Sequence, residues 1–115
     1  MKQFADKAET MMSKKPPKLM RQLLNNLHYL DKNDHEFVKK AYVFANIAHE
    51  EQLRKSGEPY INHPIAVAKI LADLRLDKES IAAGLLHDVL EDSPISPDLI
   101  AEEFGQNVLS LVDGV

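Results

Sequence analysis

The sequence contains no cysteine among its 115 residues. Without cysteine the chain can form neither a disulfide framework nor a thiolate metal site, which is compatible with a reducing compartment. No apolar run approaches the roughly 20 residues of a membrane-spanning helix, and residues 1–15 lack the apolar core of a secretory signal. We therefore expect a cytoplasmic protein without a membrane segment.

An excess of positive charge is also lacking. The chain carries 14 lysine and arginine residues against 18 aspartate and glutamate residues, which gives a formal net charge of -4. A surface that binds duplex nucleic acid usually makes a domain basic, so we expect no direct binding to DNA. The hydrophobic content of 44% and the charged content of 28% are ordinary for a globular chain. The length corresponds to one domain or to a piece of one.

The strict alternation that indicates strands is absent, and apolar residues instead recur at helical spacing. We predict an all-α fold, with helices over residues 17–30, 35–49 and 64–74, a central helix, and further helices after Ser96. The expected N-caps are Asn33 or Asp34, Asn62, Asp77 and Ser96. Residues 1–16 are expected to form a separate N-terminal segment, either flexible or a short helix, because Pro16 and Pro17 end any helix there.

The stretch Ile81–Asp92 reads IAAGLLHDVLED, and we predict that it lies on one helix. At about 100° per residue, its apolar residues cover half of the circumference, while Gly84, His87, Asp88 and Glu91 share the remaining sector. No lysine or arginine occurs from position 80 to position 92. A glycine inside a helix costs roughly 1 kcal/mol relative to alanine. A cation beside His87 and Asp88 would supply the missing charge and use the space left by Gly84. The alternative is an incidental pair on a surface helix.

The segment between residues 51 and 62 has no helical periodicity. Arg54 and Lys55 precede Gly57 there, and such a pair is either simply solvated or binds an anion such as phosphate. Tyr60 could stack on a base or a ribose, or it could anchor the loop in the core.

Histidines outside the central stretch allow more than one interpretation. His63 stands at a helix start, where it is either solvated or a metal ligand brought to the central stretch from a second helix. His49 ends its helix, where the dipole favours a cationic ring, and either a structural or a direct chemical role is open. We expect His28 to be exposed or partly buried, and His35 to be solvated.

Two motifs carry a resemblance to a known family. The segment RKSGEPYINHP is followed, 24 positions after His63, by HDVLED. Together they closely resemble the hydrolase domain of the RelA/SpoT homologue family, within the HD superfamily of metal-dependent phosphohydrolases. The resemblance covers about Ala41 to Val115, where FGQNVLSLVDGV is similar to the family's continuation. It implies an HD-domain helical bundle that removes the 3′-pyrophosphate of ppGpp and pppGpp, giving GDP or GTP plus pyrophosphate, usually with Mn²⁺.

The resemblance also implies roles for individual residues. It implies that the metal ligands are His63, His87 and Asp88. It implies that an acidic pair, Glu91 and Asp92, handles the attacking water and the 3′-phosphate. It implies that a loop with Arg54, Lys55 and Ser56 contacts the nucleotide. The chemistry of the residues agrees. Pyrophosphate hydrolysis needs an activated water, cations near the phosphate oxygens and a carboxylate to orient or deprotonate the water.

The family's metal site takes a further aspartate from a helix well downstream, and many members also carry a synthetase domain. Asp113 is the only aspartate after Asp98, and it comes too early to match that ligand. We therefore expect residues 17–115 to be the N-terminal part of an HD-type hydrolase domain, truncated at its C-terminus, with the fourth ligand beyond residue 115. Such a fragment of a longer bifunctional enzyme should bind metal weakly, hydrolyse alarmone poorly, and be prone to self-association through exposed apolar surface.

Two alternatives remain open from the sequence. One is an HD phosphohydrolase for another nucleotide, against which the RKSGEPY loop argues, because the bare HD signature does not include it. The other is a non-catalytic helical module for regulation or interaction. The intact set of imidazole and acidic residues argues against it, since a purely structural role would not require them.

Overall fold

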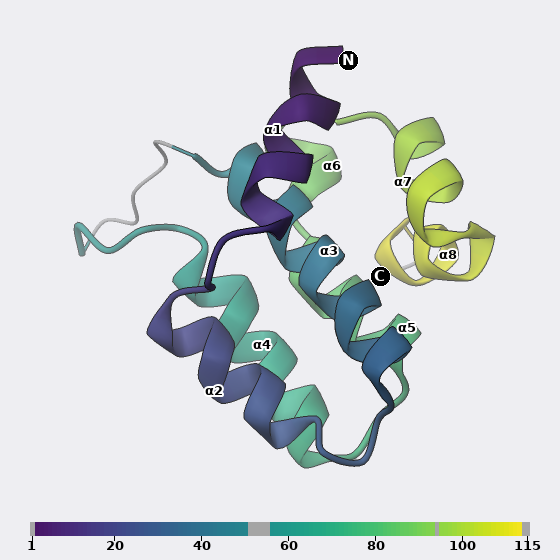
Figure 1. Cartoon of the computed structure of the whole chain (residues 1–115). Coiled ribbons are helices and arrows are strands. Elements are labelled where there is room, and N and C mark those ends of the chain that lie inside the picture. The colour runs from purple at the N-terminus through teal and green to yellow at the C-terminus, as the bar shows by residue number, and fades with distance from the viewer. Residues whose placement is uncertain (1, 51–55, 94, 114–115) are drawn as a thin grey trace.

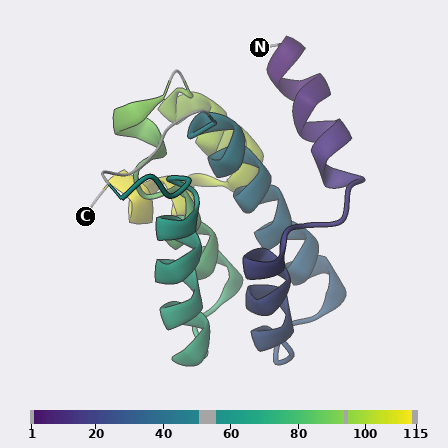
Figure 2. The same cartoon turned by 90° about the vertical axis from the view of Figure 1, so that its left-hand side faces the viewer.

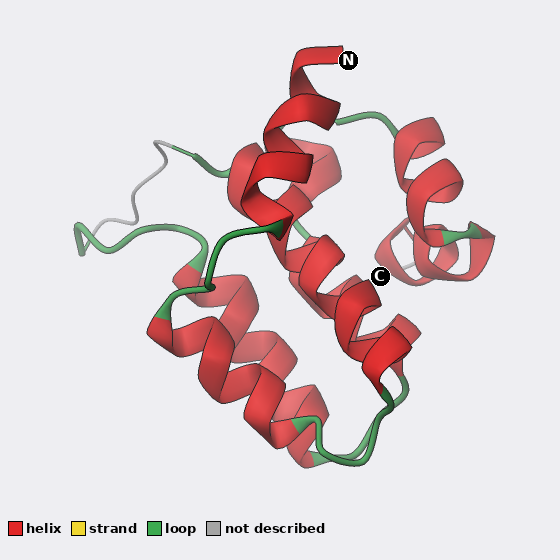
Figure 3. Cartoon of the chain, in the orientation of Figure 1, coloured by secondary structure: helices red, strands yellow, loops and turns green. Residues whose placement is uncertain are grey.

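The computed structural model describes residues 2–50, 56–93 and 95–113, and in these ranges the chain forms helices and no strand (Figures 1 and 3). The predicted all-α fold is thereby confirmed. None of the described helices has the length and apolarity needed to cross a membrane. The helices are α1 (Lys2–Met12), α2 (Lys18–Asn26), α3 (Lys32–Ala48), α4 (Asn62–Asp73), α5 (Lys78–Leu86), α6 (Val89–Asp92), α7 (Pro97–Phe104) and α8 (Gln106–Asp113).

Helix α5 is the centre of the bundle. It packs against α3, α4 and α8, while α2 lies alongside α4 (Figures 1 and 2). All six residues from Ile81 to Leu86 are buried. A helical segment that is apolar on every side is stable only when neighbours bury it, and residues 81–86 of α5 meet that condition. The position of its C-terminal end is therefore fixed by the core.

Two of the predicted N-caps are confirmed. The Asp77 carboxylate accepts a hydrogen bond from the amide of Ser80 at 2.8 Å, and the Ser96 hydroxyl accepts one from the amide of Leu99 at 3.2 Å. Each bond satisfies an amide in the first turn that has no partner inside its helix. The starts of α5 and α7 are thus set by their own sequences.

Two other predicted caps are wrong. Helix α3 begins at Lys32 and its cap is Asp31, which accepts from the amide of Asp34 at 2.8 Å, so neither Asn33 nor Asp34 is the cap. Asn62 is the first residue of α4 and does not cap it. There the preceding residues already form a turn that leads into the helix, so the side-chain cap is replaced by backbone hydrogen bonds.

The prediction that Ile81–Asp92 lies on one helix is wrong. Helix α5 ends at Leu86, and α6 starts only at Val89. The reason lies in the ring of His87, whose Nδ1 is 2.6 Å from the carbonyl oxygen of Gly84. In a continuous helix this oxygen would bond to the amide of Asp88. A side chain that competes for a backbone group weakens the helix at that point, and Asp88 has φ -98° and ψ -2°.

On the side that faces α4, Gly84 does not leave the open space that was expected for a cation, although it lines an apolar cavity together with His87. A Cβ atom at this position would lie 2.7 Å from Cδ1 of Leu71 and 3.7 Å from Cα of Ala68, both on α4. The glycine instead permits the close approach of α4 to α5. This contact sets the middle of α4 against the last turn of α5, and the first turn of α4 then lies beside the junction of α5 and α6.

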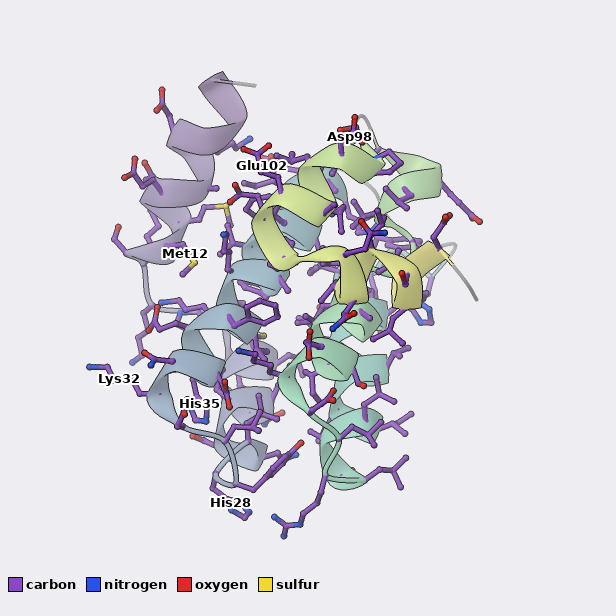
Figure 4. All side chains as sticks on the ribbon, turned by 90° about the vertical axis from the view of Figure 1, so that its right-hand side faces the viewer. Met12, His28, Lys32, His35, Asp98 and Glu102 are labelled. Carbon is purple, nitrogen blue, oxygen red and sulfur yellow. The ribbon has the colours of Figure 1, made fainter. Side chains whose placement is uncertain are left out.

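His28 and His35 lie away from the C-terminal end of α5. His28 is exposed, as expected, at the end of the molecule opposite Asp98 and Glu102 of α7 (Figure 4). His35 was expected to be solvated, but it is half-buried and its Nε2 lies 2.7 Å from the carbonyl oxygen of Leu27. The difference arises because α3 folds back on the end of α2 and brings the ring to the Leu27 carbonyl, which also accepts from the amide of Leu30 at 2.9 Å.

A candidate metal centre

Three side chains from two parts of the chain meet beside the break in the central stretch. His63 comes from the start of α4, and His87 and Asp88 come from the junction of α5 and α6. One potential ligand atom from each lies within 4.8 Å of the others. The Oδ2 atom of Asp88 is 3.2 Å from His87 Nε2 and 4.0 Å from His63 Nε2. The structure thus brings together the three residues predicted to be ligands, and their role as ligands stays a prediction.

A tight turn presents His63 to this cluster. The amide of Asn62 donates to the carbonyl of Pro59 at 3.2 Å, and the amide of His63 donates to the carbonyl of Tyr60 at 3.0 Å. Pro64 follows in the first helical turn, where its missing amide hydrogen costs nothing. The ring centroids of His63 and His87 are 5.4 Å apart, with the edge of one ring toward the other.

The contact of His87 with Gly84 decides which ring nitrogen faces the cluster. A carbonyl oxygen can only accept, so Nδ1 carries the hydrogen and donates it. In the neutral ring Nε2 is then the atom with a lone pair, and this is the nitrogen 3.2 Å from Asp88. A backbone carbonyl that fixes the tautomer of a ligating histidine is a common feature of metal sites.

The cluster is partly open to solvent. The side chains of His63, His87 and Asp88 are 35%, 28% and 22% exposed. Beside them lies an apolar cavity of about 350 Å³ formed by α4, α5 and Leu111 of α8, which His87 also lines. A small ligand can therefore reach the three side chains from outside the core.

The donor set fits a divalent cation. Two neutral imidazoles and one carboxylate carry a formal charge of -1, so the group favours a positive ion. Imidazole nitrogen suits Zn²⁺, Fe²⁺ and related ions, carboxylate oxygen suits Mg²⁺ and Mn²⁺, and a mixed set is compatible with several of them. Three protein ligands leave positions for water, substrate or a further side chain.

Tyr60 and His49, whose roles the sequence left open, both support the cluster. The Tyr60 hydroxyl donates to Oδ2 of Asp88 at 2.7 Å, a contact between positions 28 residues apart. The Tyr60 ring also lies against the ring of His49, with centroids 4.5 Å apart. His49 is only 3% exposed. The spacing of Tyr60 and His63, three residues apart before a helix, is the one local signal that could have indicated a shared turn.

Of the other predicted site residues, the structure describes the side chains of Glu91 and Ser56, and neither belongs to the three-residue group. Glu91 is exposed on α6. Asp92 ends α6, and its side chain lies outside the described residues, as do Arg54 and Lys55. Ser56 is exposed in a turn that precedes α4. The structure therefore leaves the predicted roles of these five residues as predictions.

The sequence profile of the HD domain matches residues 41–115. A guanosine-3′,5′-bis(diphosphate) 3′-pyrophosphohydrolase of Vibrio cholerae is 52% identical over 87 residues, which are 76% of this chain and 12% of that protein. A GTP pyrophosphokinase of Myxococcus xanthus is 52% identical over 82 residues, 71% of this chain and 11% of that protein. The bifunctional (p)ppGpp synthase/hydrolase SpoT of Escherichia coli is 49% identical over 87 residues, 76% of this chain and 12% of that protein.

The chain thus spans about an eighth or less of the length of these relatives. Their names include a hydrolase, a synthetase and a bifunctional enzyme, all of the RelA/SpoT type, so the resemblance inferred from the two motifs is confirmed. The matched profile covers more than half of the chain and includes all three clustered side chains. This protein belongs to the HD domain family.

Proposed function

We propose that this chain forms part of the site at which a RelA/SpoT homologue hydrolyses ppGpp and pppGpp. The reaction adds water and yields GDP or GTP together with pyrophosphate. The observation that carries the proposal is the meeting of His63, His87 and Asp88 from two separate parts of the chain. The names of two of the relatives, a 3′-pyrophosphohydrolase and a synthase/hydrolase, support the choice of substrate.

The proposed cofactor is a divalent cation held by His63, His87 and Asp88. Mn²⁺ is favoured because the resembling family usually contains it and because the mixed nitrogen and oxygen donors are compatible with it. When bound, such an ion supplies a lowered pKa for water and positive charge beside phosphate oxygens. Further ligands are expected from water, substrate or a residue outside this chain.

The remaining steps fall to side chains around the cluster. Glu91, three positions after Asp88, is proposed with Asp92 to orient or deprotonate the attacking water and to contact the 3′-phosphate. Arg54, Lys55 and Ser56 are proposed to bind the nucleotide, since a guanidinium and an ammonium group on one loop suit phosphate oxygens. A cytoplasmic location is part of the proposal and is supported by the nucleotide substrate.

The test is pyrophosphate release from ppGpp in the presence of Mn²⁺, measured with the protein at its natural length. We expect release that Asp88→Asn reduces by about 100-fold or more, because the loss of a ligand should exceed the 10–100-fold effect of losing a group that merely orients one. Asp77→Asn is the matched control, since asparagine also caps helices, and it should retain full activity.

Three results would contradict the proposal. Activity that survives in Asp88→Asn would place the reaction elsewhere. A folded protein that binds Mn²⁺ but releases no pyrophosphate would indicate another nucleotide as substrate. A folded protein that neither binds Mn²⁺ nor hydrolyses ppGpp would favour a regulatory or interaction module.

A further inference from the structure

A tyrosine outside the three candidate ligands reaches their carboxylate. The Tyr60 hydroxyl donates to Oδ2 of Asp88 at 2.7 Å, and this is the oxygen that faces both histidines. We propose that Tyr60 is a positioning residue, which holds Asp88 in the orientation in which it binds a divalent cation together with the two histidines. This inference rests on the metal site of the proposed function.

The hydrogen bond is compatible with simultaneous binding of a cation. A carboxylate oxygen has two lone pairs, and the Tyr60 hydroxyl uses one of them. The side chain of Asp88 is 22% exposed, so without this bond it could rotate toward water. Fixing the carboxylate before a cation arrives removes part of the ordering cost of binding.

Tyr60 is itself held by the backbone that presents His63. The carbonyl of Tyr60 accepts from the amide of His63 at 3.0 Å, and the two rings meet edge to face with centroids 6.1 Å apart. One residue therefore contacts two candidate ligands from different parts of the chain, His63 through the turn and Asp88 through the hydroxyl. A shift of Tyr60 would change the distance between those ligands.

His49 provides a fixed surface for the Tyr60 ring. The two rings are inclined by 36° with their centroids 4.5 Å apart, and His49 is 3% exposed. The amide of His49 donates to the carbonyl of Ala45 at 3.0 Å, which ties it to the last turn of α3. Since α3 packs against α5, the position of Tyr60 is connected to the core that also carries the α5–α6 junction. We infer that His49 acts on the site through Tyr60.

The first experiment measures the Mn²⁺ dissociation constant of the natural-length protein and of Tyr60→Phe by calorimetry. Phenylalanine keeps the ring that packs on His49 and removes only the hydroxyl. We expect affinity to fall by about tenfold or more with unchanged stoichiometry, as is typical when a group that orients a metal ligand is lost. The matched control is Tyr29→Phe. The hydroxyl of Tyr29 donates to the carbonyl of Leu76 at 2.6 Å, at the other end of α5. This control variant should bind Mn²⁺ like the wild type.

The second experiment tests the route through Tyr60 with a double-mutant cycle. His49→Ala should weaken Mn²⁺ binding clearly when Tyr60 is present and should cause a smaller loss in the Tyr60→Phe background, where only the contact with His63 through the turn remains. Losses that simply add would show that His49 acts independently, contrary to the inference. Should His49→Ala fail to fold, the comparison of Tyr60→Phe with Tyr29→Phe decides the proposal alone.

Mn²⁺ binding by Asp88→Asn shows whether a negative result disproves the role of Tyr60 alone or the metal site itself. If wild-type protein binds no Mn²⁺, or if Asp88→Asn binds it equally well, the metal site is wrong and the role of Tyr60 falls with it. If wild-type protein binds, Asp88→Asn does not and Tyr60→Phe binds like the wild type, the metal site stands and the positioning role is overturned.

Discussion

Asp77 and Asp88 stand on either side of α5, and each occupies the N-cap position of a helix. Asp77 accepts from the amide of Ser80 at 2.8 Å, and this bond lowers the pKa of its carboxyl group. Asp88 makes no cap bond to the described helix α6, and its carboxylate instead accepts from Tyr60. The same residue type thus stabilises a helix at one end of α5 and serves the candidate site at the other.

At Asp88 the sequence departs from the charge pattern that stabilises a helix. A carboxylate just beyond the C-terminal end of a helix meets the negative end of the helix dipole, which costs about 0.3–1 kcal/mol when exposed. Asp88 lies there, and His87 beside it occupies the carbonyl that would continue the helix. Both departures coincide with the cluster of potential ligands, as expected where function conflicts with local stability.

The largest difference between the two aspartates should be in metal binding. We expect Asp88→Ala to weaken Mn²⁺ binding by about 100-fold or more, because it removes a ligand rather than a group that supports one. Asp77→Ala should leave the affinity unchanged. Titration calorimetry of both variants at natural length measures this, and similar losses in the two would abolish the distinction.

The next largest effect should be on the free energy of unfolding when a larger residue replaces Gly84 of α5. Gly84→Val is expected to lower the free energy of unfolding by about 2 kcal/mol through overpacking against α4. Gly84→Ala should cost much less, since the one contact of its Cβ that is too close is with the flexible end of Leu71, which can turn into the adjoining cavity. Urea denaturation distinguishes the two, and an equal cost for both would mean that Leu71 cannot move.

The free energy of unfolding should depend more on Asp77 than on Asp88, the reverse of their order in metal binding. Asp77→Ala should lower the free energy of unfolding by about 1 kcal/mol through the loss of its cap. Asp88→Asn, measured without metal, should change it by no more than about 0.5 kcal/mol, since it removes an unfavourable charge near the end of α5 and keeps an acceptor for Tyr60. A clear destabilisation by Asp88→Asn would show that its carboxylate is needed for folding.

The smallest effect should be the pH dependence at Asp77. The pKa of its carboxyl group in the folded protein is below the ordinary value of 3.8, because the Ser80 amide bonds to the charged form. Its charge therefore contributes stability that is fully present above pH 3.8 and is lost as the pH falls through the lower, folded pKa. The stability difference between the wild type and Asp77→Ala should shrink between pH 5 and pH 2, and a constant difference would contradict this.

Local rules predicted much of this arrangement. Apolar periodicity indicated the helices, residue chemistry identified the caps at Asp77 and Ser96, and the two motifs indicated the three clustered side chains. The break before Val89 was not predicted, since it depends on one ring bonding to one carbonyl. The contact of Gly84 with α4 and that of Tyr60 with Asp88 were not predictable either, because each joins residues brought together only by packing.

Pulsed electron paramagnetic resonance of Mn²⁺ bound to the natural-length protein tests the metal site most directly. We expect nitrogen couplings from two imidazoles, of which His63→Ala removes one and His87→Ala the other, while His35→Ala removes neither. His35 is the control because its ring also contacts a backbone carbonyl but belongs to no ligand cluster in the part of the chain that the structure describes. A Mn²⁺ signal without nitrogen couplings, or one that both His63→Ala and His87→Ala leave unchanged, would contradict the proposed metal site.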